Sequence, residues 1–235
     1  MKDLLAIIFA SYIIYGVSCL KVVVSGYNTK IAVYDVLDQI GPNLNLSAEW
    51  ELGSDGKNMT WLQLDGDNIW GGHEVGDYDG VDGSVVSRWQ ISADGSSLER
   101  LDYTYTGSVY TAHLLVDKNQ GKAYAANYGG SALSVIDLQG DDTVGRLEEV
   151  IFYGVIDCRD DSRPHQTFTK DNFVWVVDLG CDMIWHYFID ENGSLYHFNQ
   201  TSIRAGAGPR HAVFHPTQNL MFLICELQSY VQVYR

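Results

Sequence analysis

Proline is scarce in this sequence, with 4 residues among 235, whereas glycine contributes 23. Helical periodicity is also missing beyond residue 19, since apolar residues alternate instead of recurring at intervals of three and four. Many glycines permit tight turns between strands, and the 15 tyrosines are typical of sheets. These features favour an all-β protein and argue against a helical bundle.

Positive charge is in short supply as well. The chain has 15 Lys and Arg residues against 30 Asp and Glu, which gives a formal net charge of -15. Such an excess of negative charge repels phosphate backbones, so nucleic acid is excluded as a partner. It does not exclude a small anion, because a few basic side chains can dominate the potential inside one cleft.

Long apolar runs are absent except at the N-terminus. There a mostly apolar stretch from Leu4 to Val17 follows Lys2 and ends at Val17-Ser-Cys19. The stretch is short for a membrane span and typical of a signal peptide, residues 1–19. A buried first strand or a short membrane anchor is the alternative. Four N-x-S/T sequons fit a secretory route, at Asn45, Asn58, Asn192 and Asn199. We expect a secreted, extracellular protein with no membrane attachment after cleavage.

Cysteine is rare, too. Cleavage after Cys19 leaves Cys158, Cys181 and Cys225, an odd number that cannot pair completely. No C-x-x-C spacing is present, so we expect no zinc site. One bridge, such as Cys158 to Cys181, and buried free thiols are both compatible with the sequence.

Pairs of alternating segments recur about every fifty residues, the spacing typical of propeller blades. The pairs are 21–24 with 31–34, 68–70 with 85–89, 122–127 with 133–136, 173–178 with 183–187, and 220–226 with 230–234. Turn signals such as Asp94-Gly95 and Asn192-Gly193 separate them. The pattern predicts a β-propeller with about five blades. A β-sandwich, which also spaces its strands evenly, is the alternative.

One stretch carries a family resemblance. Gly206-Ala-Gly-Pro-Arg-His-Ala-Val-Phe-His-Pro216, followed by Glu226-Leu-Gln-Ser-Tyr-Val-Gln-Val-Tyr234, resembles the signature of the 6-phosphogluconolactonase family. Arg163-Pro-His165 and Asp178-Leu-Gly-Cys-Asp182 match its motifs as well. The family also includes carboxy-cis,cis-muconate lactonizing enzymes, and its members are seven-bladed propellers. The resemblance implies one lactonase-like domain over residues 20–235. Because members continue for roughly two more blades, we expect a fragment or shortened product. A closed five-bladed ring is the alternative.

Basic residues lie at the start of the first long strand in three successive blades. In a propeller this part of the chain lies near the mouth of the central channel. The candidate catalytic residues are His113, Arg163, His165, Arg210, His211 and Glu226. Arginine binds carboxylate and phosphate through two hydrogen bonds, and histidine moves protons near neutral pH. We therefore expect a small anionic substrate and no metal or cofactor.

Two reactions fit such a site. A histidine could activate water to hydrolyse a lactone while the arginines stabilise the oxyanion. Alternatively, the arginines could hold a carboxymuconate while His113 or Glu226 exchanges a proton at carbon. A secreted propeller without catalysis, binding a protein or a glycan, remains the alternative from another class.

Other polar residues have structural interpretations. His215 before Pro216 is expected to cap a turn, and His186 and His197 to pack or lie on the surface. Asp178 and Asp182 could form turns or bind substrate. The acidic stretch 77–83 resembles a calcium loop, but Arg88 occupies the position that requires a glutamate. We expect it to be an insertion in the second blade.

Overall fold

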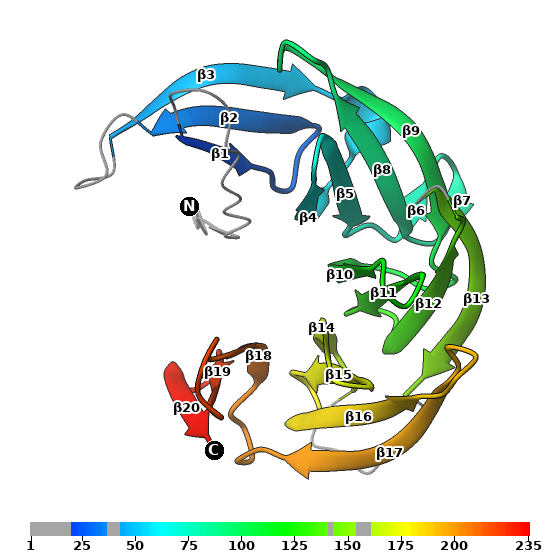
Figure 1. Ribbon diagram of the computed structural model, residues 1–235, viewed down its shortest axis with the longest axis vertical. Helices are drawn as coiled ribbons and strands as arrows, with labels where there is room; N and C mark the ends of the chain where they lie inside the picture. The colour runs from blue at the N-terminus through cyan, green and yellow to red at the C-terminus, as the bar shows by residue number, and fades with distance from the viewer. Residues whose placement is uncertain (1–19, 37–42, 141–142, 154–160) are drawn as a thin grey trace.

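The computed structural model describes residues 20–36, 43–140, 143–153 and 161–235. Five antiparallel sheets follow one another around an open arc, with their innermost strands toward a common axis (Figure 1). This arrangement confirms the predicted β-propeller and its five blades. The proposed signal peptide, residues 1–19, lies outside the described residues.

Three blades are complete four-stranded meanders, in which each strand pairs with the next. Blade 2 contains β4 (Met59–Asp65), β5 (Asn68–His73), β8 (Val85–Ile91) and β9 (Leu98–Tyr105). Blade 3 contains β10 (Thr111–Asp117), β11 (Lys122–Asn127), β12 (Ala132–Leu138) and β13 (Val144–Phe152). Blade 4 contains β14 (Pro164–Lys170), β15 (Phe173–Asp178), β16 (Met183–Ile189) and β17 (Leu195–Ser202).

The blades at the two ends of the arc each have three strands among the described residues. Blade 1 contains β1 (Leu20–Val24), β2 (Lys30–Val36) and β3 (Leu44–Glu51), and a 3-10 turn, η1 (Gly53–Gly56), leads into blade 2. Blade 5 contains β18 (Pro209–Phe214), β19 (Met221–Cys225) and β20 (Tyr230–Tyr234). The register pair Lys21–Asp35 in blade 1 matches Lys122–Asp137 in blade 3. By this match β1 is the second strand of its blade, and blade 1 has no innermost strand among the described residues.

Apolar side chains fill the space between successive blades. A separate buried cluster lies at each of the four blade interfaces, and each combines residues of both neighbouring sheets. Trp50, for example, packs with Trp89 between blades 1 and 2, and Tyr124 packs with Trp185 between blades 3 and 4. Large aromatic side chains suit this wedge-shaped space because each buries much apolar area. The high aromatic content of the sequence is thus explained by the fold.

The sheet faces that border the opening of the arc are apolar too. Val213, Ile224 and Val233 of blade 5 are about half exposed, as are Leu44 and Leu46 of blade 1. None of the described residues covers these faces, whereas the equivalent positions in the inner blades are packed against a neighbour.

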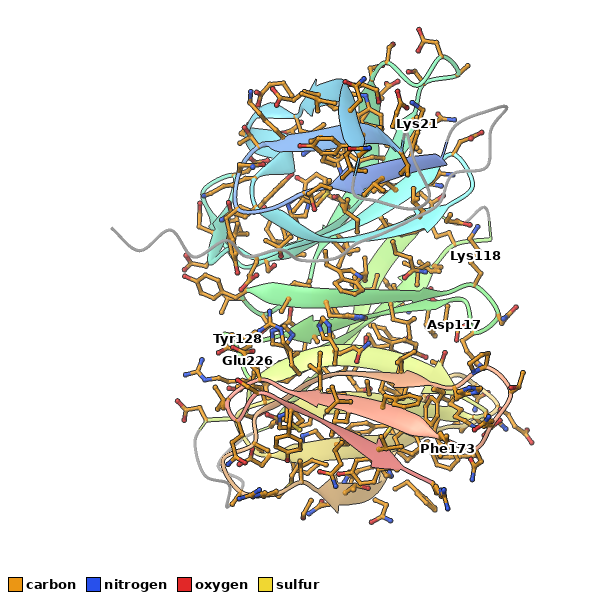
Figure 2. All side chains as sticks on the ribbon, turned by 90° about the vertical axis from the view of Figure 1, so that its left-hand side faces the viewer. Lys21, Asp117, Lys118, Tyr128, Phe173 and Glu226 are labelled. Atoms are coloured by element: carbon orange, nitrogen blue, oxygen red, sulfur yellow. The ribbon has the colours of Figure 1, made fainter. Side chains whose placement is uncertain are left out.

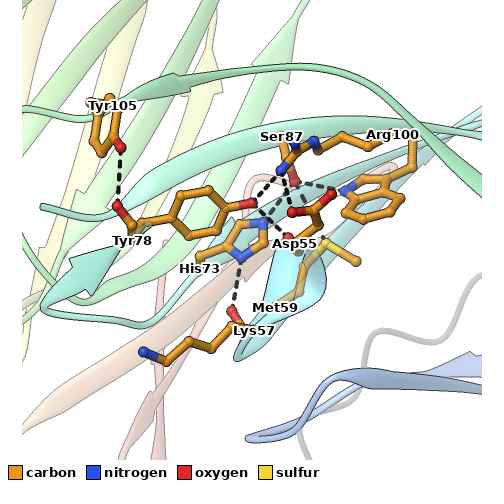
Figure 3. Close-up of polar contacts among 9 residues, drawn as sticks. Asp55, Lys57, Met59, His73, Tyr78, Ser87, Arg100 and Tyr105 are labelled. Atoms are coloured by element: carbon orange, nitrogen blue, oxygen red, sulfur yellow. Dashed lines mark hydrogen bonds and ion pairs between the residues drawn. The ribbon is translucent and has the colours of Figure 1, made fainter. Parts of the chain in front are cut away.

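Blade 2 carries the predicted acidic insertion. It forms a small hairpin of β6 (Asp77–Tyr78) and β7 (Val81–Asp82) between β5 and β8. The Tyr78 side chain is buried, and its hydroxyl donates to the carbonyl of Asp55 and accepts from Arg100 (Figure 3). This network fixes the insertion against the segment that links blades 1 and 2.

A buried histidine lies next to this network. His73 has no exposed surface, and its ring nitrogens contact the Lys57 carbonyl at 2.8 Å and the Ser87 hydroxyl at 2.7 Å (Figure 3). The Trp89 indole N–H donates to the same hydroxyl. Burial lowers the pKa of His73 to about 4. His73 is therefore a neutral structural link within blade 2.

The cysteines fall into two classes. Cys181 is disulfide-bonded, and its partner lies outside the described residues, as does Cys158. Cys225 is a buried free thiol. The described residues thus contain one disulfide-bonded cysteine and one buried free thiol, and the bridge from Cys158 to Cys181 stays a prediction.

Candidate functional site

The same irregularity recurs in the innermost strands of blades 2 to 5. In each strand the antiparallel register shifts by one residue near its start, as in a β-bulge, and one residue has no partner. The extra residues are Thr60, Ala112, His165 and Arg210. A bulge turns adjacent side chains away from strict alternation, so each blade presents two consecutive residues near the channel axis.

Two further sets of equivalent residues follow from this register. The residues directly after the bulge are Trp61, His113, Gln166 and His211. The residues directly after the second strand are Glu74, Tyr128, Leu179 and Glu226, and each donates its backbone N–H to a carbonyl just before the innermost strand. Figure 2 shows Tyr128 and Glu226 at the same end of the strands, opposite Asp117 and Lys118. We call this end the mouth.

Aromatic rings converge on the axis below the mouth. The His211 ring lies with its centroid 5.2 Å from His165, 6.1 Å from His113 and 5.7 Å from Trp61. The Trp61 ring also lies 3.9 Å from the His113 ring between centroids, at a tilt of 36°. Side chains from blades 2, 3, 4 and 5 thus meet in one cluster, as expected for three of its members from the sequence.

The histidines of this cluster are uncharged. Burial, followed by the positive charge of Arg210, lowers the pKa of His211 to about 4. Burial also holds the pKa of His165 and of His113 well below the usual range. Arg210 and then His211 add to this effect at His165, and the other two histidines of the cluster add to it at His113. Neutral imidazoles can accept protons at neutral pH. The Nδ1 atom of His165 and the Nε2 atom of His211 have no hydrogen-bond partner among the described residues.

His113 differs from the other two histidines. It is buried under Trp61, and its Nδ1 atom lies 3.4 Å from both the backbone N–H and the hydroxyl of Thr167. The geometry gives it a packing contact between blades 3 and 4.

Two arginines border the mouth. The Arg210 guanidinium forms an ion pair with the Glu226 carboxylate, so the two candidates lie together. The Arg163 guanidinium lies over the Tyr128 ring at 5.1 Å, and that ring lies 5.6 Å from His165. Both arginines are half-buried and lie beside the histidines, where an anion can be bound with reduced screening by water.

Two aspartates hold these arginines in place. The Asp178 carboxylate accepts the backbone N–H of Arg163 at 2.8 Å, the Ser162 hydroxyl at 2.6 Å and the indole N–H of Trp185 at 2.9 Å. The Asp182 carboxylate accepts the N–H groups of the loop before β18. These are Gly206 and Gly208, both at 2.7 Å.

The two glycines explain the motif before Arg210. Both have positive φ, 76° for Gly206 and 61° for Gly208, which other residues rarely adopt. Their N–H groups point to Asp182, and Arg210 follows directly in β18. The sequence left two roles open for Asp178 and Asp182, turn formation and substrate binding. Their hydrogen bonds in the structure are those of turn-forming residues.

The remaining histidines have the structural roles expected. His215 Nδ1 accepts the N–H groups of Thr217 and Gln218 and so caps a turn. The His186 ring packs against the Trp175 ring, with 4.0 Å between the two centroids. His197 contacts the Trp185 ring at 6.0 Å on the blade surface.

Five residues in or just below the mouth were not among the candidates from the sequence: Tyr27, Thr60, Trp61, Glu74 and Tyr128. The Tyr27 hydroxyl donates to Glu74 Oε2 at 2.6 Å, and Thr60 donates to the same oxygen at 3.2 Å. Tyr27 also lies within the electrostatic influence of Arg210 and Tyr128. The signal that could have revealed these residues is their repeat position, since Tyr27, like Tyr128, follows the second strand of its blade.

Within the described ranges, no group of three or more His, Cys, Asp or Glu side chains is placed to hold a metal ion. The same part of the chain contains no helix of the length and hydropathy that crossing a membrane requires.

The fold and the mouth together define a β-propeller with arginines and neutral histidines at one end of its channel. A family model described as "Lactonase, 7-bladed beta-propeller" matches residues 21–235. The chain therefore belongs to this lactonase family, as the motif resemblance implied.

Individual relatives agree with this assignment. The chain is 28% identical over 151 residues to a 6-phosphogluconolactonase of Bacillus subtilis, covering 62% of this chain and 43% of that protein. It is 32% identical over 154 residues to a 6-phosphogluconolactonase of Pectobacterium atrosepticum, covering 64% and 44%. The matched region thus spans less than half the length of these relatives.

Solved structures show the same fold. A protein from Lactobacillus plantarum superposes with a TM-score of 0.76 at 25% identity, covering 92% of this chain and 62% of that one. A periplasmic gluconolactonase of Pseudomonas aeruginosa superposes with a TM-score of 0.73 at 17% identity, covering 92% and 64%.

Proposed function

We propose that this propeller hydrolyses a small anionic lactone of the 6-phosphogluconolactone type at its mouth. The observation that carries the proposal is the position of Arg210 beside His165 and His211. These are two neutral imidazoles, and each has a nitrogen without a hydrogen-bond partner in the described part of the chain. The names of the relatives support a lactone as substrate. No described feature favours a carboxymuconate, so the proposal is confined to lactone hydrolysis.

The residues suit a two-step hydrolysis. A neutral imidazole of His211 or His165 accepts a proton from water as the water oxygen attacks the lactone carbonyl carbon. The Arg210 guanidinium stabilises the oxyanion that forms on the carbonyl oxygen. The bond from the carbonyl carbon to the ring oxygen then breaks, and the imidazolium returns its proton to that oxygen. The product is the open hydroxy acid, and the histidine is neutral again.

The arginines also explain how an anionic substrate binds to a chain with a formal net charge of -15. A guanidinium donates two parallel hydrogen bonds to a phosphate or carboxylate. Arg163 and Arg210 are half-buried, which strengthens this attraction relative to a fully solvated pair.

The direct test is hydrolysis of 6-phosphogluconolactone by the purified chain, corrected for the spontaneous reaction. We expect turnover that falls by about a hundredfold or more in Arg210→Ala, since loss of one oxyanion donor has this effect in other hydrolases. A folded protein without turnover would contradict the proposal. Binding of the hydroxy acid without turnover would instead indicate a binding propeller.

We also propose that the protein is exported. The support is the apolar run after Lys2 together with sequons at Asn45, Asn192 and Asn199, which are exposed on the blades. Expression in a secreting eukaryotic host should deliver the chain to the medium with glycans that peptide N-glycosidase removes. Retention inside the cells would contradict this proposal.

A further inference from the structure

Glu74 lies on the blade 1–2 side of the mouth with its carboxylate fixed on one side only. The Tyr27 hydroxyl and the Thr60 hydroxyl both donate to Oε2, at 2.6 and 3.2 Å. Oε1 accepts no hydrogen bond from the described residues, and none of their Lys or Arg side chains forms an ion pair with Glu74. A carboxylate held in this way has one oxygen available to accept a hydrogen bond from a ligand.

The repeat places this carboxylate in the site. Thr60 is the extra residue of the bulge in β4, the position that His165 holds in β14 and Arg210 holds in β18. Glu74 is likewise the equivalent of Glu226. Both therefore face the same channel end as the residues proposed for catalysis.

Arg210 of blade 5 acts on this part of the mouth across the opening of the arc. Tyr27 belongs to the β1–β2 connection of blade 1, yet the charge of Arg210 from blade 5 acts on its hydroxyl. Burial and the hydrogen bond to Glu74 raise the pKa of Tyr27, so this hydroxyl keeps its proton and continues to donate. Tyr27 thus fixes the Glu74 carboxylate at the mouth.

The two sides of the mouth differ in the groups they can bind. Arg163 and Arg210 attract an anion, whereas Glu74 repels one and accepts hydrogen bonds from hydroxyl groups. We propose that Thr60, Glu74 and Tyr27 form a subsite for the hydroxyl groups of a polyhydroxy substrate whose anionic end lies at the arginines. This inference rests on the proposed function only for the placement of the anionic end of the substrate at the arginines.

The subsite also separates two substrate classes. A sugar lactone with one phosphate offers hydroxyls to Glu74 and its charge to the arginines. A carboxymuconate has carboxylates and no hydroxyls, so one of its charges would meet the Glu74 carboxylate. The mouth is therefore built for the sugar acid derivative.

The test compares two ligands by isothermal titration calorimetry. 6-Phosphogluconate carries a phosphate, a carboxylate and chain hydroxyls, whereas 6-(phosphonooxy)hexanoate carries the same charges without the hydroxyls. We expect the wild-type protein to bind 6-phosphogluconate about tenfold or more tightly, the effect of one hydrogen bond to a charged group. Glu74→Ala should remove this preference, and Tyr27→Phe should reduce it.

Two control variants complete the design. Glu99→Ala removes an exposed carboxylate on the outer strand β9 and should leave the preference unchanged. Arg210→Ala should weaken both ligands to the same extent. Circular dichroism spectra show whether each variant is folded.

The outcomes distinguish this inference from the proposed function. An unchanged preference in folded Glu74→Ala, or a wild-type protein that binds the two ligands equally or not at all, would overturn the hydroxyl subsite. A retained preference that depends on Glu74, in a protein without lactone turnover, would support the subsite and contradict only the hydrolysis.

Discussion

His165 and His211 come from adjacent blades, and their rings lie 5.2 Å apart between centroids in an edge-to-face arrangement. Burial and the positive charge of Arg210 lower the pKa of both histidines, and His211 adds to this effect at His165. The arrangement keeps two proton acceptors neutral next to a fixed positive charge. A site of this kind differs from a single exposed histidine in how its activity responds to pH.

The first prediction concerns this response. An unperturbed histidine has a pKa of about 6.5 and loses its ability to accept protons as the pH falls below this value. The pKa of His211 is about 4, so the imidazole stays unprotonated down to about pH 5. We expect kcat for lactone hydrolysis, measured at saturating substrate, to stay constant from about pH 7 to about pH 5, since kcat does not report the phosphate of the free substrate.

Initial rates across this range, corrected for spontaneous hydrolysis, provide the measurement. Arg210→Ala removes a positive neighbour, so any residual activity should decline at a higher pH than in the wild type. A wild-type profile that declines with a midpoint near 6.5 would refute the assignment of the buried histidines.

The second prediction concerns the shape of the guanidinium. Arg210→Lys retains the positive charge but loses the planar pair of donors that fits carboxylate and phosphate. We expect kcat/KM to fall by about tenfold to a hundredfold while the protein remains folded. Arg204→Lys is the matched control, because Arg204 is exposed on the connection before β18. Equal activity of Arg210→Lys and the wild type would show that charge alone suffices.

Much of the fold could be predicted from the sequence because the second and third strands of each blade carry local signals. The predicted pair 173–178 and 183–187 coincides with β15 (Phe173–Asp178) and the start of β16 (Met183–Ile189). Buried central strands are apolar and end in polar turns, which a single sequence displays. The outer strand β17 is almost entirely exposed, so it has no such pattern.

The site could be predicted only in part. His165, Arg210 and His211 were found because their residue types suggest anion binding and proton transfer. Threonine and glutamate are common on protein surfaces, so Thr60 and Glu74 did not stand out in the sequence. The strand register at the bulge in β4 shows that they lie where the other blades have His165, Arg210 and Glu226. A bulge disturbs the alternation on which sequence patterns depend, so the direction of these side chains required the structure.

The third prediction concerns the loop that precedes Arg210. Asp182 accepts the N–H groups of Gly206 and Gly208, and its replacement by asparagine substitutes an amide donor for one of the acceptor oxygens. We expect Asp182→Asn to lower the free energy of unfolding by about 1–3 kcal/mol and to reduce kcat/KM. Urea denaturation and lactone kinetics provide the two measurements.

Asp171→Asn is the control for this variant. Asp171 lies in an exposed turn at a positive φ of 54°, which asparagine tolerates well. It should match the wild type in both measurements. If Asp182→Asn also matched the wild type, the loop would not depend on this carboxylate.

The fourth prediction concerns His73 and the dependence of stability on pH. Its pKa is about 4 in the folded protein and about 6.5 in the unfolded chain, so the unfolded chain binds more protons between these values. The contribution of His73 is therefore complete above about pH 6.5 and is lost as the pH falls toward 4. Its size over this window is on the order of 3 kcal/mol.

His73→Gln tests this contribution. The variant should be less stable than the wild type at pH 7, because the Ser87 hydroxyl and the Lys57 carbonyl lose their partner. Its free energy of unfolding should then decrease less steeply between about pH 6.5 and 4, since this titration is gone. Substitution of His197, on the exposed surface of β17, should leave the steeper dependence in place. Parallel pH profiles of His73→Gln and the wild type would show that His73 is not the group that titrates.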